Sequence, residues 1–303
     1  MTHPQLEQAA ALIRAGRLVA FPTETVYGLG ANALDEAAVR RIFEAKGRPP
    51  SSPVIVHVAS LEMARALASQ WPAQAEALAV RFWPGPLTLV VPKQSSIPPI
   101  VSAGLPTVGL RMPAHPLALA LIEASGCPIA APSANRFTQL SPTTASHVRK
   151  SLGDAVDLVL DGGSTPVGIE STVVSLAADP PLLLRPGMIT REELESVIGP
   201  VEVRISAAGD SAHPAPGMHP RHYSPRTPLL LVRGGALPST GRGIYLRHGD
   251  AMPADPRQYA AALYATLHRC DEQGYDWIAV EEPPDSPEWA AVRDRLRRAA
   301  AAP

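Results

Sequence analysis

The chain has 303 residues, 46% of them hydrophobic and 18% charged, and its formal net charge is −1. These values predict a globular protein with room for one large domain and one small domain. The near-neutral charge gives no overall reason to expect a nucleic-acid-binding protein, although a local basic surface stays open. Proline is frequent, at 34 residues, but it lies between apolar runs, so it marks loops and does not indicate disorder.

The cysteines and the hydropathy of the chain indicate which cellular compartment to expect. Cys127 and Cys270 lie far apart, which argues against a disulfide framework or a zinc site and fits a reducing compartment. No apolar run approaches the ~20 residues that a membrane helix needs. The segment MTHPQLEQAA also lacks a basic-then-apolar targeting signal. We therefore expect a cytoplasmic protein without membrane contact.

Apolar periodicity predicts a succession of helices and strands over the first 200 residues. The expected helices cover residues 4–15, 36–46, 60–70, 72–82, 115–125, 142–152 and 191–198. The expected strands cover residues 17–21, 53–58, 87–91, 107–112, 127–135, 156–160, 171–176 and 181–185. Asp35 is placed to cap the second helix, and Thr190 with Glu193 has capping-box spacing. Because strands outnumber helices and the connections vary in length, we expect an α/β fold with a twisted, mixed, open sheet and packed helices.

The composition changes after residue 205. Residues 206–227 are rich in Pro, Gly, Ser and His and lack periodicity, which indicates a linker. Beyond it, strands are expected at 229–232, 243–246 and 276–280, with helices near 255–273 and 287–300. We therefore expect a large domain over 1–205, a linker over 206–227 and a small Rossmann-like α/β domain over 228–303.

Polar residues follow directly on the first expected strand, in the segment FPTETVYGLGANAL at residues 21–34. Thr23 and Thr25 share one face of an extended segment, and Gly28 and Gly30 would let backbone amides approach a ligand. The segment lacks both the P-loop lysine and the GxGxxG spacing. A tight turn whose hydroxyls satisfy local backbone amides is an equally good interpretation of this segment.

Two cations, Lys46 and Arg48, follow the expected helix 36–46 and can converge on one polyanion. The chain has three lysines against 24 arginines, so a lysine here is unusual for this composition. A helix C-terminus that carries favourable positive charge is the simpler interpretation. His57 lies in an apolar strand, where a histidine is more often part of the core.

Further polar side chains lie at the ends of other expected strands. Ser133 and Asn135 end the strand that begins at Cys127, at an edge where ligand groups often lie, although an Asx or Ser turn explains them equally well. Arg111 and Arg185 each lie at a strand end just before proline, where each alone could be a surface charge.

Five motifs, in this order, closely resemble those of the YrdC-like threonylcarbamoyl-AMP synthases. They are FPTETVYGLG at 21–30, KGRP at 46–49 with PVIVH at 53–57, SAN at 133–135, GIESTVV at 168–174 and LRPG at 184–187. PGM at 216–218, HYSP at 222–225 and DRLRR at 294–298 are similar to the long, two-domain form. The resemblance covers about residues 4–200 and then the linker and the small domain.

The resemblance implies a reaction of L-threonine, bicarbonate or CO2, and ATP that gives threonylcarbamoyl-AMP and pyrophosphate. It implies Mg²⁺ bound through the ATP phosphates, without a dedicated metal site of the protein. It also implies that a separate transferase complex passes the threonylcarbamoyl group to an adenosine of tRNA. The threonine carbamate is the nucleophile, so no activated Ser or Cys is required.

Site residues follow from the resemblance, position by position. It implies catalytic roles at the phosphates or the carbamate for Lys46 and Arg48. The implied threonine contacts are Thr25, His57, Arg111 and Ser171. The implied nucleotide contacts are Arg48, Ser52, Thr107, Ser133, Asn135, Arg185 and Tyr223. Because Tyr223 lies in the linker, the linker is also expected to act as a lid.

Two other functions remain alternatives. The first is a non-catalytic module that binds double-stranded RNA or tRNA, and weak direct RNA binding also stays open. The second is the carbamoyl-adenylating domain of a hydrogenase-maturation enzyme, which is similar in its core. That enzyme carries additional zinc-binding cysteine pairs, and this chain has only two isolated cysteines.

Overall fold

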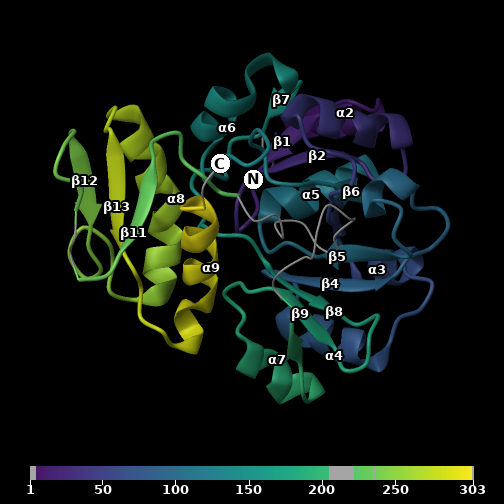
Figure 1. Ribbon diagram of the computed structural model, residues 1–303. Coiled ribbons are helices and arrows are strands. Elements are labelled where there is room, and N and C mark those ends of the chain that lie inside the picture. The colour runs from purple at the N-terminus through teal and green to yellow at the C-terminus, as the bar shows by residue number, and fades with distance from the viewer. Residues whose placement is uncertain (1–4, 205–221, 235–236, 302–303) are drawn as a thin grey trace.

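The computed structural model describes residues 5–204, 222–234 and 237–301. Two sheets organise them (Figure 1): a ten-stranded mixed sheet in the first 204 residues and a three-stranded parallel sheet near the C-terminus. The expected α/β class, with a mixed open sheet and a small second α/β unit, is confirmed. In the described part of the chain, the structure contains no helix that is both long and apolar enough to cross a membrane.

The large sheet has the strand order β10-β9-β8-β4-β5-β3-β6-β2-β1-β7. Its strands are β1 (Val19–Phe21), β2 (Gly28–Asn32), β3 (Val56–His57), β4 (Leu87–Pro92), β5 (Thr107–Arg111), β6 (Ile129–Ala130), β7 (Leu158–Val159), β8 (Thr172–Ser175), β9 (Leu182–Arg185) and β10 (Glu202–Val203). Parallel and antiparallel pairs alternate irregularly across it, as expected for a mixed sheet.

Helices pack on this sheet and bury its apolar residues. They are α1 (Leu6–Arg14), α2 (Glu36–Lys46), α3 (Leu61–Leu67), α4 (Ala73–Phe82), α5 (Pro116–Ser125), α6 (Ala145–Leu152) and α7 (Arg191–Ile198), with short 3-10 turns η1 (Pro99–Ser102) and η2 (Gly153–Ala155). Local sequence sets their ends. Asp35 accepts hydrogen bonds from two backbone amides at the start of α2, and Thr190 with Glu193 forms the predicted capping box.

The second unit is built from the last part of the chain. Its elements are β11 (Leu229–Val232), β12 (Gly243–Leu246), α8 (Pro256–Glu272), β13 (Trp277–Glu281), η3 (Pro287–Trp289) and α9 (Ala290–Ala299). Helices α8 and α9 lie between the small sheet and the first unit in Figure 1. Residues 206–221 of the expected linker and lid lie outside the described residues, whereas His222 and Tyr223 are buried.

One segment differs from its sequence prediction. Residues 28–32 are not a ligand-binding loop but strand β2, which pairs with both β1 and β6. A Cβ atom on Gly30 would lie 2.7 Å from Cε1 of Phe21 and 2.8 Å from Cγ2 of Ile129. Gly30 therefore makes room for core packing and not for a ligand, while Gly28 does face the cavity described below. Several other strands are shorter than predicted, since β3 covers only Val56–His57 and β6 only Ile129–Ala130.

We predict that Gly30→Ala lowers the free energy of unfolding by about 1–3 kcal/mol, because the added methyl group overpacks the core against Phe21 and Ile129. Urea unfolding of the single variants Gly30→Ala and Phe21→Leu and of the double variant measures this. If overpacking is the cause, the double variant loses less stability than the sum of the single variants. Strict additivity would contradict the explanation.

Candidate active site

One cavity gathers most of the side chains that the sequence marks for a site. Its walls come from the β1–β2 loop, the segment after α2, the strands β3, β5 and β9, the loops before β8 and after β6, and residues 222–223. The residues that line it are Thr23, Thr25, Val26, Gly28, Arg48, Ile55, His57, Arg111, Ala131, Pro132, Ser133, Glu170, Arg185, His222 and Tyr223. We refer to it as the central cavity.

The β1–β2 loop brings two threonine hydroxyls to the central cavity. Oγ1 of Thr23 lies 2.8 Å from Oγ1 of Thr25, across a bend and not along the extended segment that the sequence predicts. The Thr23 hydroxyl also donates to the carbonyl of Val26 at 2.7 Å and accepts from the amides of Thr25 and Val26. Thr23 therefore forms the local turn that was the alternative interpretation, and it orients the Thr25 hydroxyl at the cavity wall.

Two buried cations lie at and behind one wall of the central cavity. Helix α2 ends at Lys46, and the left-handed Gly47, with φ of 62°, turns the chain so that Arg48 lines the cavity. The Lys46 ammonium donates to the backbone carbonyls of Ser133, at 2.6 Å, and Asn135. Arg48 donates to Oγ of Ser52 at 2.6 Å and to the carbonyl of Pro53 at 2.9 Å. Within the described residues, Lys46 and Arg48 contact only neutral groups.

Burial without a counter-ion changes the acidity of both cations. Desolvation, with the nearby charge of Arg48, holds the pKa of Lys46 well below its ordinary value. Desolvation also lowers the pKa of Arg48 to about 10. An anion in the central cavity would offset both effects, because an opposite charge favours the protonated form. The arrangement therefore favours binding of a negatively charged ligand.

Arg111 reaches the central cavity from the end of β5, but it already has an acidic partner. Its Nη2 lies 2.7 Å from Oε1 of Glu24, and both side chains are buried. The second carboxylate oxygen of Glu24 accepts from the amide of Ala114 at 3.0 Å. Arg111 also donates from Nε to the carbonyl of Gly85 at 3.3 Å. Glu24 thus fixes the direction of the guanidinium at the cavity wall.

His57 is neutral at physiological pH. Burial, together with the charge of Arg111, lowers the pKa of His57 to about 3. Its ring meets that of Phe21 edge-on with a centroid distance of 5.9 Å, and its Nδ1 is buried with no partner among the described residues. His57 is therefore both a core residue, as the simpler interpretation held, and a polar group at the cavity wall.

Arg185 at the end of β9 contacts Ser171, which directly precedes β8, where these two strands pair. Arg185 donates from Nε to the carbonyl of Ser171 at 3.0 Å and from Nη2 to its Oγ at 3.1 Å. The Ser171 hydroxyl is also 2.8 Å from Oγ1 of Thr88. Arg185 lines the central cavity, and Ser171 holds it there from behind.

The structure brings most of the expected site residues together. Those that line the central cavity are Thr25, Arg48, His57, Arg111, Ser133, Arg185 and Tyr223. Lys46, Ser52 and Ser171 each contact one of these lining residues, and Asn135 is joined to them through Lys46. The Asn135 amide donates to the carbonyls of Arg136 and Gln139 within its own loop.

Thr107 is the expected site residue that is not brought to the central cavity. It lies at the start of β5, four residues before Arg111, which corresponds to ~13 Å along a strand. It is absent from the residues that line the cavity. A nucleotide contact for Thr107 therefore requires a ligand that extends beyond the central cavity.

Sequence reasoning missed two lining residues with ionisable side chains, Glu170 and His222. Glu170 lies inside the GIEST segment and His222 inside HYSP, so the motifs contain both although neither was assigned a role. Burial and the charges of Arg48 and Lys46 hold the pKa of His222 well below its ordinary value. Only the fold shows that these two side chains face the same space as Arg48.

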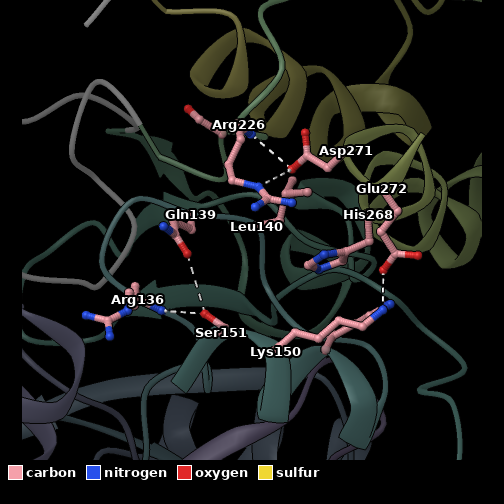
Figure 2. Close-up of a pocket in the computed structure, with 11 residues that line it drawn as sticks. Arg136, Gln139, Leu140, Lys150, Ser151, Arg226, His268, Asp271 and Glu272 are labelled. Atoms are coloured by element: carbon pink, nitrogen blue, oxygen red, sulfur yellow. Dashed lines mark hydrogen bonds and ion pairs between the residues drawn. The ribbon is translucent and has the colours of Figure 1, made fainter. Parts of the chain in front are cut away.

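A second hollow of about 420 Å³ lies between α6 and α8 and shares no residue with the central cavity (Figure 2). Its charges are largely paired. Lys150 contacts Glu272, and Asp271 accepts from the Arg226 amide at 3.0 Å. The rings of His147 and His268 stack with a centroid distance of 3.8 Å. None of the expected site residues lines this hollow.

The chain is similar to known proteins over nearly its whole length. The Sua5, YciO and YrdC family, described as telomere recombination, matches residues 11–187, and the C-terminal domain of threonylcarbamoyl-AMP synthase matches residues 189–301. The threonylcarbamoyl-AMP synthase of Pyrococcus abyssi is 46% identical over 96% of this chain and 92% of its own length. The enzyme of the same name from Bacillus subtilis is 45% identical over 98% of this chain and 93% of its own length.

A solved structure agrees in fold over the whole chain. The crystal structure of Pyrococcus abyssi Sua5 complexed with L-threonine superposes with a TM-score of 0.93 at 43% identity and covers 99% of this chain and 95% of the Pyrococcus chain. The sequence motifs, the two-unit fold and these relatives lead to one assignment. The chain belongs to the Sua5, YciO and YrdC family, in the two-domain form of the threonylcarbamoyl-AMP synthases.

Proposed function

We propose that this protein makes threonylcarbamoyl-AMP from L-threonine, bicarbonate or CO2, and ATP, with release of pyrophosphate. In this reaction the protein is a nucleotidyltransferase. A separate transferase complex uses the product to form threonylcarbamoyladenosine in tRNA. The relatives named threonylcarbamoyl-AMP synthase support the reaction, because they align over nearly the full chain. The L-threonine complex of the Pyrococcus protein supports threonine as the substrate.

The observation that carries the proposal is the pair of buried cations, Lys46 and Arg48, whose partners in the described residues are neutral. Taking a cation out of water is costly unless an anion compensates for it. A triphosphate supplies that anion, and it places charge where a phosphoryl transfer develops it. Arg185, which is also buried and lines the central cavity, adds a third cation on the nucleotide side.

The proposed chemistry needs alignment more than a protein nucleophile. The neutral threonine amine adds to CO2 and its nitrogen releases a proton to solvent, which gives a carbamate. A carbamate oxygen then forms a bond to the α-phosphorus of ATP. The bond from that phosphorus to the β-phosphate bridging oxygen breaks, and pyrophosphate leaves with the electron pair. The residues proposed to hold threonine are Thr25, His57, Arg111 and Ser171. Those proposed to hold the nucleotide are Arg48, Ser52, Thr107, Ser133, Asn135, Arg185 and Tyr223.

Mg²⁺ enters this proposal as part of the substrate, bound to ATP. Glu170, which lines the central cavity, and Glu24, which contacts its lining residue Arg111, are already paired with Arg295 and Arg111. The residues present therefore fit a metal ion held by phosphate oxygens and water rather than by a carboxylate cage of the protein. The ion would neutralise charge on the phosphates during the reaction.

The direct test is mass spectrometry of the nucleotide product after incubation with ATP, Mg²⁺, bicarbonate and each amino acid in turn. We expect a threonylcarbamoyl-AMP mass and pyrophosphate release with threonine only. RNA binding without any threonine-dependent consumption of ATP would overturn the proposal in favour of the RNA-binding module.

We predict that Arg48→Met lowers threonine-dependent pyrophosphate release by about 100-fold or more, because a fixed positive charge at the transferred group is lost. The same variant should unfold at the same temperature as the wild type or higher, because an uncompensated buried charge is removed. Arg40→Met is the matched control, since Arg40 is exposed on α2 and paired with Glu36. Full activity of Arg48→Met would contradict the role of this cation.

We predict that acid destabilises the protein partly through His57. The unfolded chain binds a proton on this side chain as pH falls through 6.5, but the folded chain does so only near pH 3. The stabilisation is thus complete above pH 6.5 and is lost progressively between pH 6.5 and 3. Between pH 7.5 and pH 5, the wild type should lose roughly 2 kcal/mol more than His57→Gln in urea unfolding. Equal losses in both proteins would contradict the prediction.

A further inference from the structure

One acidic side chain of the central cavity is held by the C-terminal unit. Glu170 lines the cavity, and its Oε2 accepts from Nε of Arg295 on α9 at 2.7 Å. Nη2 of Arg295 also donates to the backbone carbonyl of Glu170 at 3.3 Å. The hydroxyl of Tyr264 on α8 donates to Oε2 of Glu170 at 3.1 Å. Both C-terminal helices therefore hold this one carboxylate, together with Ser141 of the first unit, whose hydroxyl donates to Oε1 of Glu170 at 2.5 Å.

The same arginine contacts a second residue of the cavity wall. The guanidinium carbon of Arg295 lies 5.2 Å from the centroid of the Tyr223 ring, within cation–π distance. The Tyr264 ring lies 5.9 Å from the Tyr223 ring. Tyr223 has φ of 62°, a left-handed conformation that a bulky residue keeps only where its surroundings enforce it. Arg295 and Tyr264 supply part of those surroundings.

Arg295 itself is fixed on every side. It is 0% exposed, and Nη1 donates to the carbonyl of Pro186 at 3.0 Å and to Oδ2 of Asp294 at 2.8 Å. Its charge is thus shared between Glu170 of the first unit and Asp294 of its own helix. A side chain held this rigidly transmits the position of α9 to the residues that it contacts.

We propose that Arg295 is a positioning residue for the active site, and that the C-terminal unit completes the nucleotide side of the central cavity through it. Arg295 sets the position of Glu170 and of the Tyr223 ring without itself lining the cavity. Glu170 directly precedes Ser171, whose carbonyl and hydroxyl hold Arg185. A shift of Glu170 would therefore also move Arg185, a cationic side chain of the cavity wall. This inference rests on the proposed function for its substrate, ATP.

The test compares Arg295→Lys with the wild type in threonine-dependent pyrophosphate release, with thermal unfolding of each protein as a check on the fold. Lysine keeps the charge but loses the planar fork that binds Glu170 at two points. We expect the KM for ATP to rise about tenfold or more, while the KM for threonine changes less than threefold. A folded Arg295→Lys protein with wild-type KM and kcat for ATP would overturn the inference.

Arg297→Lys is the matched control, because Arg297 lies two residues farther along α9, is 61% exposed and contacts only Glu282, at 3.7 Å, among the described ion-pair partners. Its kinetics should equal those of the wild type. If Arg295→Lys does not fold, Tyr264→Phe decides, since it removes the hydroxyl bond to Glu170 but keeps the ring. A raised KM for ATP in that variant supports the inference, and an unchanged one refutes it.

Failure of the inference is distinguishable from failure of the proposed function. If the wild type releases no pyrophosphate with threonine, the proposed function is wrong. Titration calorimetry with MgATP then compares nucleotide affinity of the wild type and Arg295→Lys. Weaker binding by the variant supports the positioning role, whereas equal affinity, or no binding by either protein, overturns it.

Discussion

The burial of positive charge without an equal number of acidic partners is the constraint on which the central cavity depends. Lys46 and Arg48 are almost fully buried, and backbone carbonyls and a serine hydroxyl are their partners. Neutral acceptors offset only part of the cost of removing these cations from water. The remaining cost favours an anionic ligand in the central cavity.

The pairing register of the large sheet brings polar side chains to the central cavity from two different strand pairs. His57 on β3 pairs with Arg111 on β5, so a neutral imidazole and a guanidinium lie next to each other at one edge of the cavity. Arg185 on β9 pairs with Val173 on β8, which brings the nearby Ser171 within reach of the guanidinium. The contacts proposed for the amino acid and for the nucleotide thus come from different strand pairs of one sheet, which keeps their separation fixed.

The C-terminal unit does more than follow the first unit in the chain. A buried network of Arg295, Glu170, Tyr264 and Tyr223 is one of the links between the two units. Buried polar groups require partners, so neither unit can leave the other without exposing or stranding a charge. An apolar cluster that includes Val26, Ile169 and Tyr223 with Leu263 and Leu267 of α8 also holds the C-terminal unit against the cavity wall.

The sequence by itself determined the α/β class, most helices and the residue types of the site, because caps, apolar periodicity and contiguous motifs are local properties. The Asp35 cap and the seven expected site residues that line the cavity are examples. The sequence did not predict strand β2, because its Gly- and Ala-rich segment has no apolar alternation. It also did not predict that Glu170 contacts Arg295, 125 residues away. Only the tertiary structure decided these, because the partner of a buried charge depends on which distant segments the sheet and the domain interface place side by side.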